Sequence, residues 1–306
     1  MAQPSAPSSP ATQSQPSGLP FALGAYVIWG FLPLYLKLVA GVPPFEFVGW
    51  RIIWTLPFCL LILAFRRQFA EVRAALGNRR AMLALGTSAA LIGFNWFVYV
   101  WAIMAGEVYA ASIGYYLNPL LNVLLGTAFL GERLSRWQWV AVGIAALAVA
   151  LLAAGALTTL WISLSLALSF ALYGLVRKQV AVGSLPGLTI ESGLLMVPSL
   201  AIAAWYAAGP QGSAFGQDGV MSGLIVFSGV VTAVPLLLFA IAARRMEYST
   251  LGFIQYLAPT IVFFLGLFVF KQELQPAQLG SFVLIWTAVA IFVGDLLSRR
   301  RAARLA

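Results

Sequence analysis

Charge is scarce in this sequence of 306 residues: only 9% of the residues are Asp, Glu, Lys or Arg, whereas 61% are hydrophobic. A soluble domain usually carries about 25% charged residues. A soluble core this apolar would leave too few charges to cover its surface. The composition therefore predicts an integral membrane protein that crosses the bilayer several times.

Histidine is absent, and Cys59 is the single cysteine. These absences exclude histidine-based catalysis, the usual zinc sites and intramolecular disulfides. None of the three lysines (Lys37, Lys178, Lys271) follows a glycine, so the phosphate-binding loop of ATPases is missing. The carboxylates are too scattered for an intramembrane active site. We therefore expect no enzyme, no metal, no cofactor and no ATPase partner.

Long apolar runs recur along the chain, and a bilayer crossing needs about 20 such residues. The 40 residues from 137 to 176 carry no charge, which is too long for one tilted helix, so they are divided at a weak turn near Gly155 and Thr158. The ten predicted spans are 20–39, 47–65, 81–104, 109–130, 137–154, 158–176, 189–208, 220–242, 249–270 and 276–296. The predicted fold is an all-α integral membrane protein with ten transmembrane helices.

Basic residues alternate between the two sides of these spans. With ten spans, 15 of the 18 Lys and Arg residues fall on the side that holds both termini. The positive-inside rule then places both termini in the cytoplasm. Topology and lipid contact account for the net charge of +9, so no nucleic-acid partner is expected. The Pro/Ser/Gln-rich segment 1–18 is predicted to be a disordered cytoplasmic tail, and 299–306 a basic cytoplasmic tail.

An internal repeat appears when the chain is shifted by 140 residues. Tyr116 then aligns with Tyr256, Pro119 with Pro259, Gly126 with Gly266 and Gln138 with Gln278. Each half, 19–156 and 157–298, holds five crossings, and an odd number inverts the second half in the membrane. Inverted repeats are typical of secondary transporters, whose sites lie near the bilayer midplane at interrupted helices. The two prolines lie near the middle of the fourth and ninth spans and free the carbonyls of Tyr115 and Gln255.

Polar residues at helical spacing within the spans predict the wall of a central cavity. The predicted substrate-binding residues are Asn95, Tyr99, Trp101, Tyr115, Asn118, Pro119, Asn122, Trp161, Ser169, Tyr173, Gln255, Tyr256 and Pro259. The alternatives are interhelical hydrogen bonds for the amides, bonds to the own helix for the hydroxyls, and interfacial belts for the tryptophans. A wall rich in Tyr, Asn and Gln suits zwitterionic or neutral amphipathic metabolites and argues against polyanions.

Ionisable residues within or beside the spans are candidates for gating or ion pairing. Arg51, with Glu46 before it, is either a snorkelling anchor, half of an ion pair or a gate. Glu191 either pairs with Arg177 or Lys178 across a short loop or gates the cavity. Lys37, at the end of the first span, is a further candidate. Asp295 precedes a run of arginines and is expected to be solvated.

Four segments carry a resemblance to a known family: FNWFVYVWAIMAGEVYAASIGYYLNPLLNVLLGTAFLGERLSRWQW, FALYGLVRK, FIQYLAPT and FVLIWTAVAIF. They resemble the RarD branch of the EamA family, in the drug/metabolite transporter superfamily. The resemblance implies a ten-helix, two-repeat carrier of the bacterial inner membrane. Its relatives of the YddG type export amino acids and related metabolites, and RarD-type members are commonly named for chloramphenicol sensitivity.

The expected function is therefore export of amino acids and related small metabolites by alternating access. The alternatives are a chloramphenicol-type efflux carrier, a passive small-solute channel and a subunit of a membrane assembly. One feature departs from a symmetric repeat. Glu132 of the GERL motif has Gln272 as its counterpart, with Glu273 one position later, so a matched pair of acids is not preserved.

Overall fold

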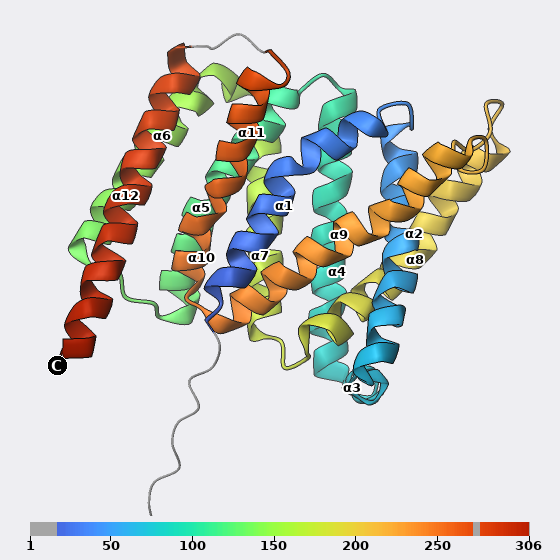
Figure 1. Ribbon diagram of the computed structural model, residues 1–306, viewed down its shortest axis with the longest axis horizontal. Coiled ribbons are helices and arrows are strands. Elements are labelled where there is room, and N and C mark those ends of the chain that lie inside the picture. Colours follow the sequence, from blue (N-terminus) through green and yellow to red (C-terminus); the bar gives the residue numbers. More distant parts are fainter. Residues whose placement is uncertain (1–16, 272–275, 306) are drawn as a thin grey trace, which may run out of the picture.

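The computed structural model describes residues 17–271 and 276–305. Most of the predicted tail 1–18, and the pair Gln272 and Glu273, lie outside the described residues. Ten helices within the described residues are long and apolar enough to cross a membrane, as the sequence predicted. Figure 1 shows them side by side, with the first and last helices reaching the same end of the bundle.

The spans and their connections follow the chain in order. They are α1 (Leu19–Leu38), α2 (Pro44–Arg66), α4 (Arg79–Met104), α5 (Val108–Leu130), α6 (Arg136–Ala153), α7 (Leu160–Gln179), α8 (Ser184–Ala208), α9 (Gly219–Arg245), α10 (Tyr248–Gln255) continued by α11 (Leu257–Phe268), and α12 (Pro276–Leu305). The short helix α3 (Phe69–Leu76) joins α2 to α4, and the 3-10 segment η1 (Ala154–Thr159) joins α6 to α7.

Two boundaries differ from those expected. The seventh span begins at Ser184 instead of 189, because proline in the first turn, here Pro186, fits a helix start where no backbone donor is needed. The basic tail predicted at 299–306 is not a separate segment, since α12 continues through Leu305. The weak turn near Gly155 takes the form of η1.

The repeat is visible in where the helices begin. Helices α2, α4, α5 and α6 start at 44, 79, 108 and 136, and α8, α9, α10 and α12 start at 184, 219, 248 and 276, each 140 residues later. Contacts between helices are also equivalent in the two halves. Helix α1 contacts α9 and α11, and its counterpart α7 contacts α4 and α5. The offset found in the sequence therefore corresponds to an equivalence between helices.

The two prolines of the repeat do not act alike. Helix α5 continues across Pro119, whereas the ninth span breaks at Tyr256 into α10 and α11. At the break, the Tyr256 N–H donates to the Phe253 carbonyl, a tighter 3-10 bond, at 3.3 Å. The two prolines were expected to mark interrupted helices, and the structure shows such an interruption in the ninth span and a continuous helix in the fourth.

Glu132 fastens the start of α10. Its carboxylate accepts hydrogen bonds from the backbone N–H groups of Tyr248 (2.6 Å) and Ser249 (2.8 Å) and from the Ser249 hydroxyl (2.7 Å). A carboxylate suits the positive end of a helix dipole and its unsatisfied N–H groups. Further along α10, Gly252 lets the helix pack closely on α5, because a Cβ there would lie 2.9 Å from the Pro119 carbonyl oxygen.

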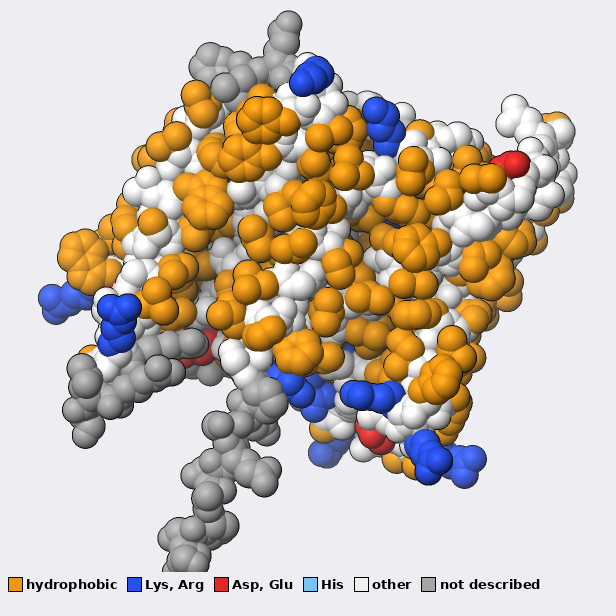
Figure 2. Space-filling view, in the orientation of Figure 1, with side chains coloured by type: hydrophobic (Ala, Val, Ile, Leu, Met, Phe, Trp, Pro, Cys, Tyr) orange, Lys and Arg blue, Asp and Glu red, His pale blue; other side chains and the backbone are white. Residues whose placement is uncertain are grey.

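The bundle has two distinct ends. The connections α2–α4, α5–α6, α7–α8 and α9–α10 lie at the same end as the start of α1 and the end of α12, at the bottom of Figure 1; we call this the termini end. The connections α1–α2, α4–α5, α6–α7 and α8–α9 form the opposite end. In Figure 2 hydrophobic side chains cover the flank of the bundle, and most visible Lys and Arg side chains lie at the termini end. This is the surface expected of a protein surrounded by lipid.

Candidate functional site: a central cavity closed at one end

A cavity of about 590 Å³ lies inside the bundle. Small-molecule sites commonly enclose about 300–1,000 Å³, so this volume suits a metabolite. Most of its wall comes from α1, α2, α4, α5, α11 and α12, and single residues of α6, α7, α9 and α10 complete it, which places the cavity between the two repeats. The wall reaches Val39 and Val42 between α1 and α2 and Val108 at the start of α5. The cavity therefore extends towards the opposite end.

Six of the predicted residues line this cavity: Asn95, Tyr99, Tyr115, Asn118, Gln255 and Pro259. The rings of Tyr99 and Tyr115 meet edge to face, with centroids 5.9 Å apart. The side chain of Asn118 is 2% exposed, and its Oδ1 atom has no hydrogen-bond partner among the described residues. A buried acceptor left without a donor is costly, so Asn118 is suited to accept a hydrogen bond from a solute.

Arg51 is the only charged side chain among the described residues of the wall. Its Nε atom donates to Thr232 Oγ1 on α9 at 3.0 Å. Its guanidinium lies over the Trp96 ring, 4.8 Å from the centroid. A cation–π contact and one hydrogen bond fix the orientation of the side chain within the wall.

The termini end is closed by a buried ion pair. Arg177 Nη1 lies 3.4 Å from Glu191 Oε1, and both side chains are almost fully buried. The Ser88 hydroxyl donates to the same carboxylate oxygen at 2.5 Å, and Arg177 Nη2 donates to the Ser184 carbonyl at 2.9 Å. Gly187 makes room for the guanidinium, because a Cβ there would overlap it. No other ion pair is found among the side chains that the structure describes.

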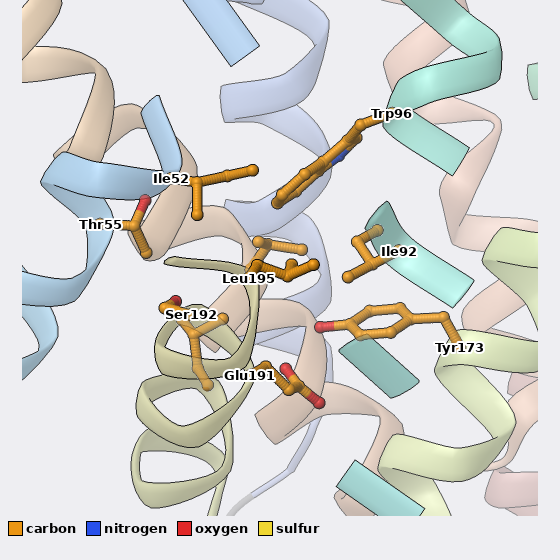
Figure 3. Close-up of a pocket in the computed structure, with 10 residues that line it drawn as sticks. Ile52, Thr55, Ile92, Trp96, Tyr173, Glu191, Ser192 and Leu195 are labelled. Atoms are coloured by element: carbon orange, nitrogen blue, oxygen red, sulfur yellow. The ribbon is translucent and has the colours of Figure 1, made fainter. Parts of the chain in front are cut away.

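A water-sized void separates this ion pair from the cavity. Its volume is about 10 Å³, roughly the space that one water occupies. Ile92, Trp96 and Leu236 line both the void and the cavity. Figure 3 shows the Tyr173 hydroxyl pointing into the void, with Trp96 on one side and Glu191 on the other. One layer of side chains thus divides the cavity from the buried charges.

Further contacts between helices seal the same end. The Lys178 ammonium donates to the carbonyls of Ala243 (3.0 Å) and Met246 (2.6 Å), and the Tyr248 hydroxyl donates to the Ala171 carbonyl (2.7 Å). An aromatic cluster lies beside them, and its members are Tyr26, Trp29, Phe170, Tyr173 and Phe239. The termini end is therefore sealed, whereas the cavity extends towards the opposite end.

Comparison with known proteins places the chain in a family. The model of the EamA-like transporter family matches residues 16–154. Protein RarD of Streptomyces exfoliatus is 40% identical over 298 residues, which cover 96% of this chain and 94% of that protein. The chain belongs to the RarD branch of the EamA family. It is thus a multi-pass membrane transporter of the drug/metabolite transporter superfamily, and not an enzyme.

A more distant relative of this EamA transporter is the chloramphenicol-sensitive protein RarD of Pseudomonas aeruginosa, 29% identical over 300 residues, which cover 94% of this chain and 97% of that protein. A solved crystal structure matches with a TM-score of 0.72 at 19% identity, covering 92% of this chain and 98% of the other. At that identity the likeness shows a shared fold.

Two predicted residues, Asn122 and Ser169, lie behind the cavity wall and bond to residues that line it. Asn122 Nδ2 donates to Gln255 Oε1 at 3.0 Å, which joins α5 to α10. Asn95 Nδ2 donates to Ser169 Oγ at 2.9 Å, which joins α4 to α7. For these side chains the structure shows the interhelical bonds that were the alternative interpretation. Three more predicted residues are buried and do not line the cavity, namely Pro119, Tyr173 and Tyr256.

Trp101 and Trp161 do not line the cavity, contrary to expectation. Their rings contact each other, with centroids 5.3 Å apart, and the side chains are 38% and 51% exposed on the outside of the bundle. Trp101 follows Tyr99 by two residues, which is about 200° around a helix, so it points away from the cavity when Tyr99 points inwards. The alternative of an aromatic surface position fits these two residues.

The gating candidates separate into three groups. Arg177 and Glu191 form an ion pair, which was one of the alternatives for Glu191, whereas Lys37 is exposed, with its Nζ atom 5.4 Å from the Phe270 ring centroid. Glu46 makes no ion pair with Arg51. It instead accepts from Ser213 Oγ (2.5 Å), the Ala214 N–H (2.8 Å) and Trp50 Nε1 (3.1 Å), and so fixes the α8–α9 connection to α2.

Asp295 is not free in solvent either. It accepts a hydrogen bond from the Ser135 hydroxyl at 2.7 Å and joins α12 to the start of α6. The arginines that follow it suggested a solvated helix end, but α12 continues past them. Counting charges along the sequence does not reveal this hydrogen bond, because the partner of Asp295 is the uncharged side chain of Ser135.

Sequence reasoning missed part of the wall, notably Trp96, Gln278 and Ser281. Trp96 and Tyr99 are three residues apart, so the stripe that contains Tyr99 was the available signal. Gln278 had been noticed only as the repeat partner of Gln138. The two have different roles, since Gln138 completes a capping box with Ser135 at the start of α6. Ser281 Oγ is buried without a partner among the described residues.

Proposed function

We propose that this transporter exports amino acids and related small metabolites by alternating access, and that it lies in the bacterial inner membrane with both termini in the cytoplasm. One observation carries the proposal: a metabolite-sized cavity between the repeats extends to one end of the bundle and is sealed at the other. Secondary transporters place their site at this position, between inverted repeats.

The cavity offers both kinds of group that a zwitterion needs. The unpartnered Asn118 oxygen is an acceptor for an ammonium group, and the hydroxyls of Tyr99 and Tyr115 can donate to a carboxylate. Aromatic rings form much of the remaining wall. In the alternate state, the ion pair between Arg177 and Glu191 separates and the termini end opens.

Counterflow in liposomes tests this function. Purified protein is reconstituted with unlabelled amino acids inside, and uptake of labelled amino acids is followed. We expect saturable counterflow that Asn118→Ala and Tyr115→Ala reduce and that Trp161→Ala, on the outer surface, leaves unchanged. If no member of a broad amino-acid panel moves, the substrate assignment is wrong. Flux without saturation or counterflow would indicate a channel, and no flux with a co-purifying protein would indicate an assembly subunit.

Efflux of neutral drugs is a second candidate. It is supported by the name of the chloramphenicol-sensitive relative and by the largely apolar wall. Chloramphenicol should therefore be included as a competitor in the counterflow assay. Competition at concentrations near those of the amino acids would favour drug efflux, and no competition would favour metabolite export.

A further inference from the structure

The repeat makes charged positions at one end of the bundle equivalent to charged positions at the other end. Arg51 is the eighth residue of α2, and Glu191 is the eighth residue of α8, the helix that repeats α2. The same 140-residue offset pairs Lys37 with Arg177. At the termini end, the positions hold a base and an acid, which neutralise each other. At the opposite end, the equivalent positions hold two bases.

Among the described residues of the cavity wall, no acid takes the place of Glu191 beside Arg51. Glu46, the acid nearest to Arg51 in α2, is fully buried, and its Oε1 atom accepts three hydrogen bonds from Trp50, Ser213 and Ala214. No carboxylate is among the described residues of the cavity wall. Lys37 is exposed beside Phe270 and leaves Arg51 as the single charge of the wall.

The terminal N–H groups of the Arg51 guanidinium have no hydrogen-bond acceptor among the described residues. Its Nε atom is bonded to Thr232, and its face lies on Trp96, but its two terminal nitrogens make no hydrogen bond to the described residues. These two nitrogens are also not among the enclosed polar atoms without partners, as the nitrogens of Arg177 are. The fixed, unoccupied edge of a guanidinium matches the two oxygens of a carboxylate.

We infer that Arg51 binds the carboxylate of the transported solute, so the substrates are small monocarboxylates, with amino acids among them, and the neutral analogues are excluded. The inference rests on the proposed transport function and narrows its substrate class. The solute supplies the negative charge that Glu191 supplies at the termini end. Trp96, Tyr99 and Tyr115 surround this position and favour a carboxylate that carries an apolar or aromatic body.

Matched acids and amides test the inference by binding and by flux. The probes are L-phenylalanine against L-phenylalaninamide, and 3-phenylpropionate against 3-phenylpropionamide. Binding is measured as thermal stabilisation of the purified full-length protein, and transport as inhibition of counterflow. In the wild type we expect the acids to bind at least about tenfold more tightly than the amides, as a charged hydrogen-bonded pair predicts.

Variants assign the preference to Arg51. Arg51→Gln should abolish the difference between acid and amide, and Arg51→Lys, which keeps the charge without the planar fork, should retain part of it. Lys37→Gln and Trp161→Ala are the controls and should keep the preference, because neither side chain lines the cavity. Size-exclusion chromatography checks that each variant is folded. If Arg51→Gln is not monodisperse, Arg51→Lys and the wild-type ratio of acid to amide affinity decide.

The outcomes separate this inference from the proposed function. Equal binding of acids and amides by the wild type, or an unchanged preference in Arg51→Gln, overturns the role of Arg51 even if amino acids are transported. A carboxylate preference that Arg51→Gln removes supports the role of Arg51. If such a preference exists while no panel member is transported, the binding role stands and the transport proposal fails.

Discussion

At the termini end, the eighth residue of α8 is an acid held by a base, whereas the eighth residue of α2, towards the opposite end, is a base with no acid beside it. The helices that carry these residues start at equivalent positions, and both side chains bond to a hydroxyl on a helix of the other half, Ser88 for Glu191 and Thr232 for Arg51. The scaffold of the repeat is therefore shared, and the difference between closed and open ends lies in the charges placed on it.

The largest effect is expected from breaking the charge balance at the termini end. Arg177→Leu leaves Glu191 buried without its counter-ion, and the loss of one partner of a buried pair typically costs about 3–5 kcal/mol. We expect a lower free energy of unfolding, measured in mild detergent with a denaturant. The double variant Arg177→Leu/Glu191→Leu should recover most of the loss, because no isolated charge remains. A double variant as unstable as the single one would contradict this account.

A smaller effect is expected from crowding the ion pair without removing it. In Gly187→Ala the new methyl group overlaps the Arg177 guanidinium, and overpacking of this kind costs about 1–3 kcal/mol. The matched control is Gly86→Ala, where nothing lies within 4 Å of the new Cβ and a helical glycine is replaced by a better helix former. The melting temperature should fall for Gly187→Ala and stay level or rise for Gly86→Ala. Equal shifts would mean that the ion pair is not tightly enclosed.

The smallest effect concerns the contact between the repeats. Asn122 on α5 bonds to Gln255 on α10, and interhelical hydrogen bonds in membranes average about 0.6 kcal/mol. A double-mutant cycle of Asn122→Ala and Gln255→Ala should give a coupling energy of about that size in unfolding experiments. A coupling near zero would show that close packing, and not this bond, holds the two halves together at the midplane.

The sequence was informative where a signal extends over many residues. Apolar length and charge alternation predicted ten spans, and a few matched residues predicted the offset that the helix starts follow. The proximity of Arg177 and Glu191 also followed, because a short loop connects their helices. The spans follow from solvation by lipid, the ion pair follows from chain connectivity, and the offset follows from matches between the two halves of the sequence.

The prediction of the cavity wall was weaker, for a physical reason. A polar side chain inside a membrane must find a partner, and spacing alone does not tell a solute from another helix. Asn122 and Asn118 lie one turn apart on α5, yet the Asn122 amide nitrogen bonds to Gln255 behind the wall, whereas Asn118 lines the cavity. The asymmetry of the two prolines was likewise hidden, since Pro119 and Pro259 have similar local sequences and different neighbours.

The break at Tyr256 has a mechanical consequence. Glu132 anchors the first residues of α10, and the close approach of Gly252 to Pro119 ties α10 to α5, so the two form one stiff arm up to the break. Beyond it, α11 is a lever of 12 residues, about 18 Å long. A bend of about 10° at Tyr256 moves the far end of this lever by about 3 Å, which is close to the diameter of a water molecule. Because α11 forms part of the cavity wall as far as Leu267, a small rotation at this peptide unit would change the width of the cavity.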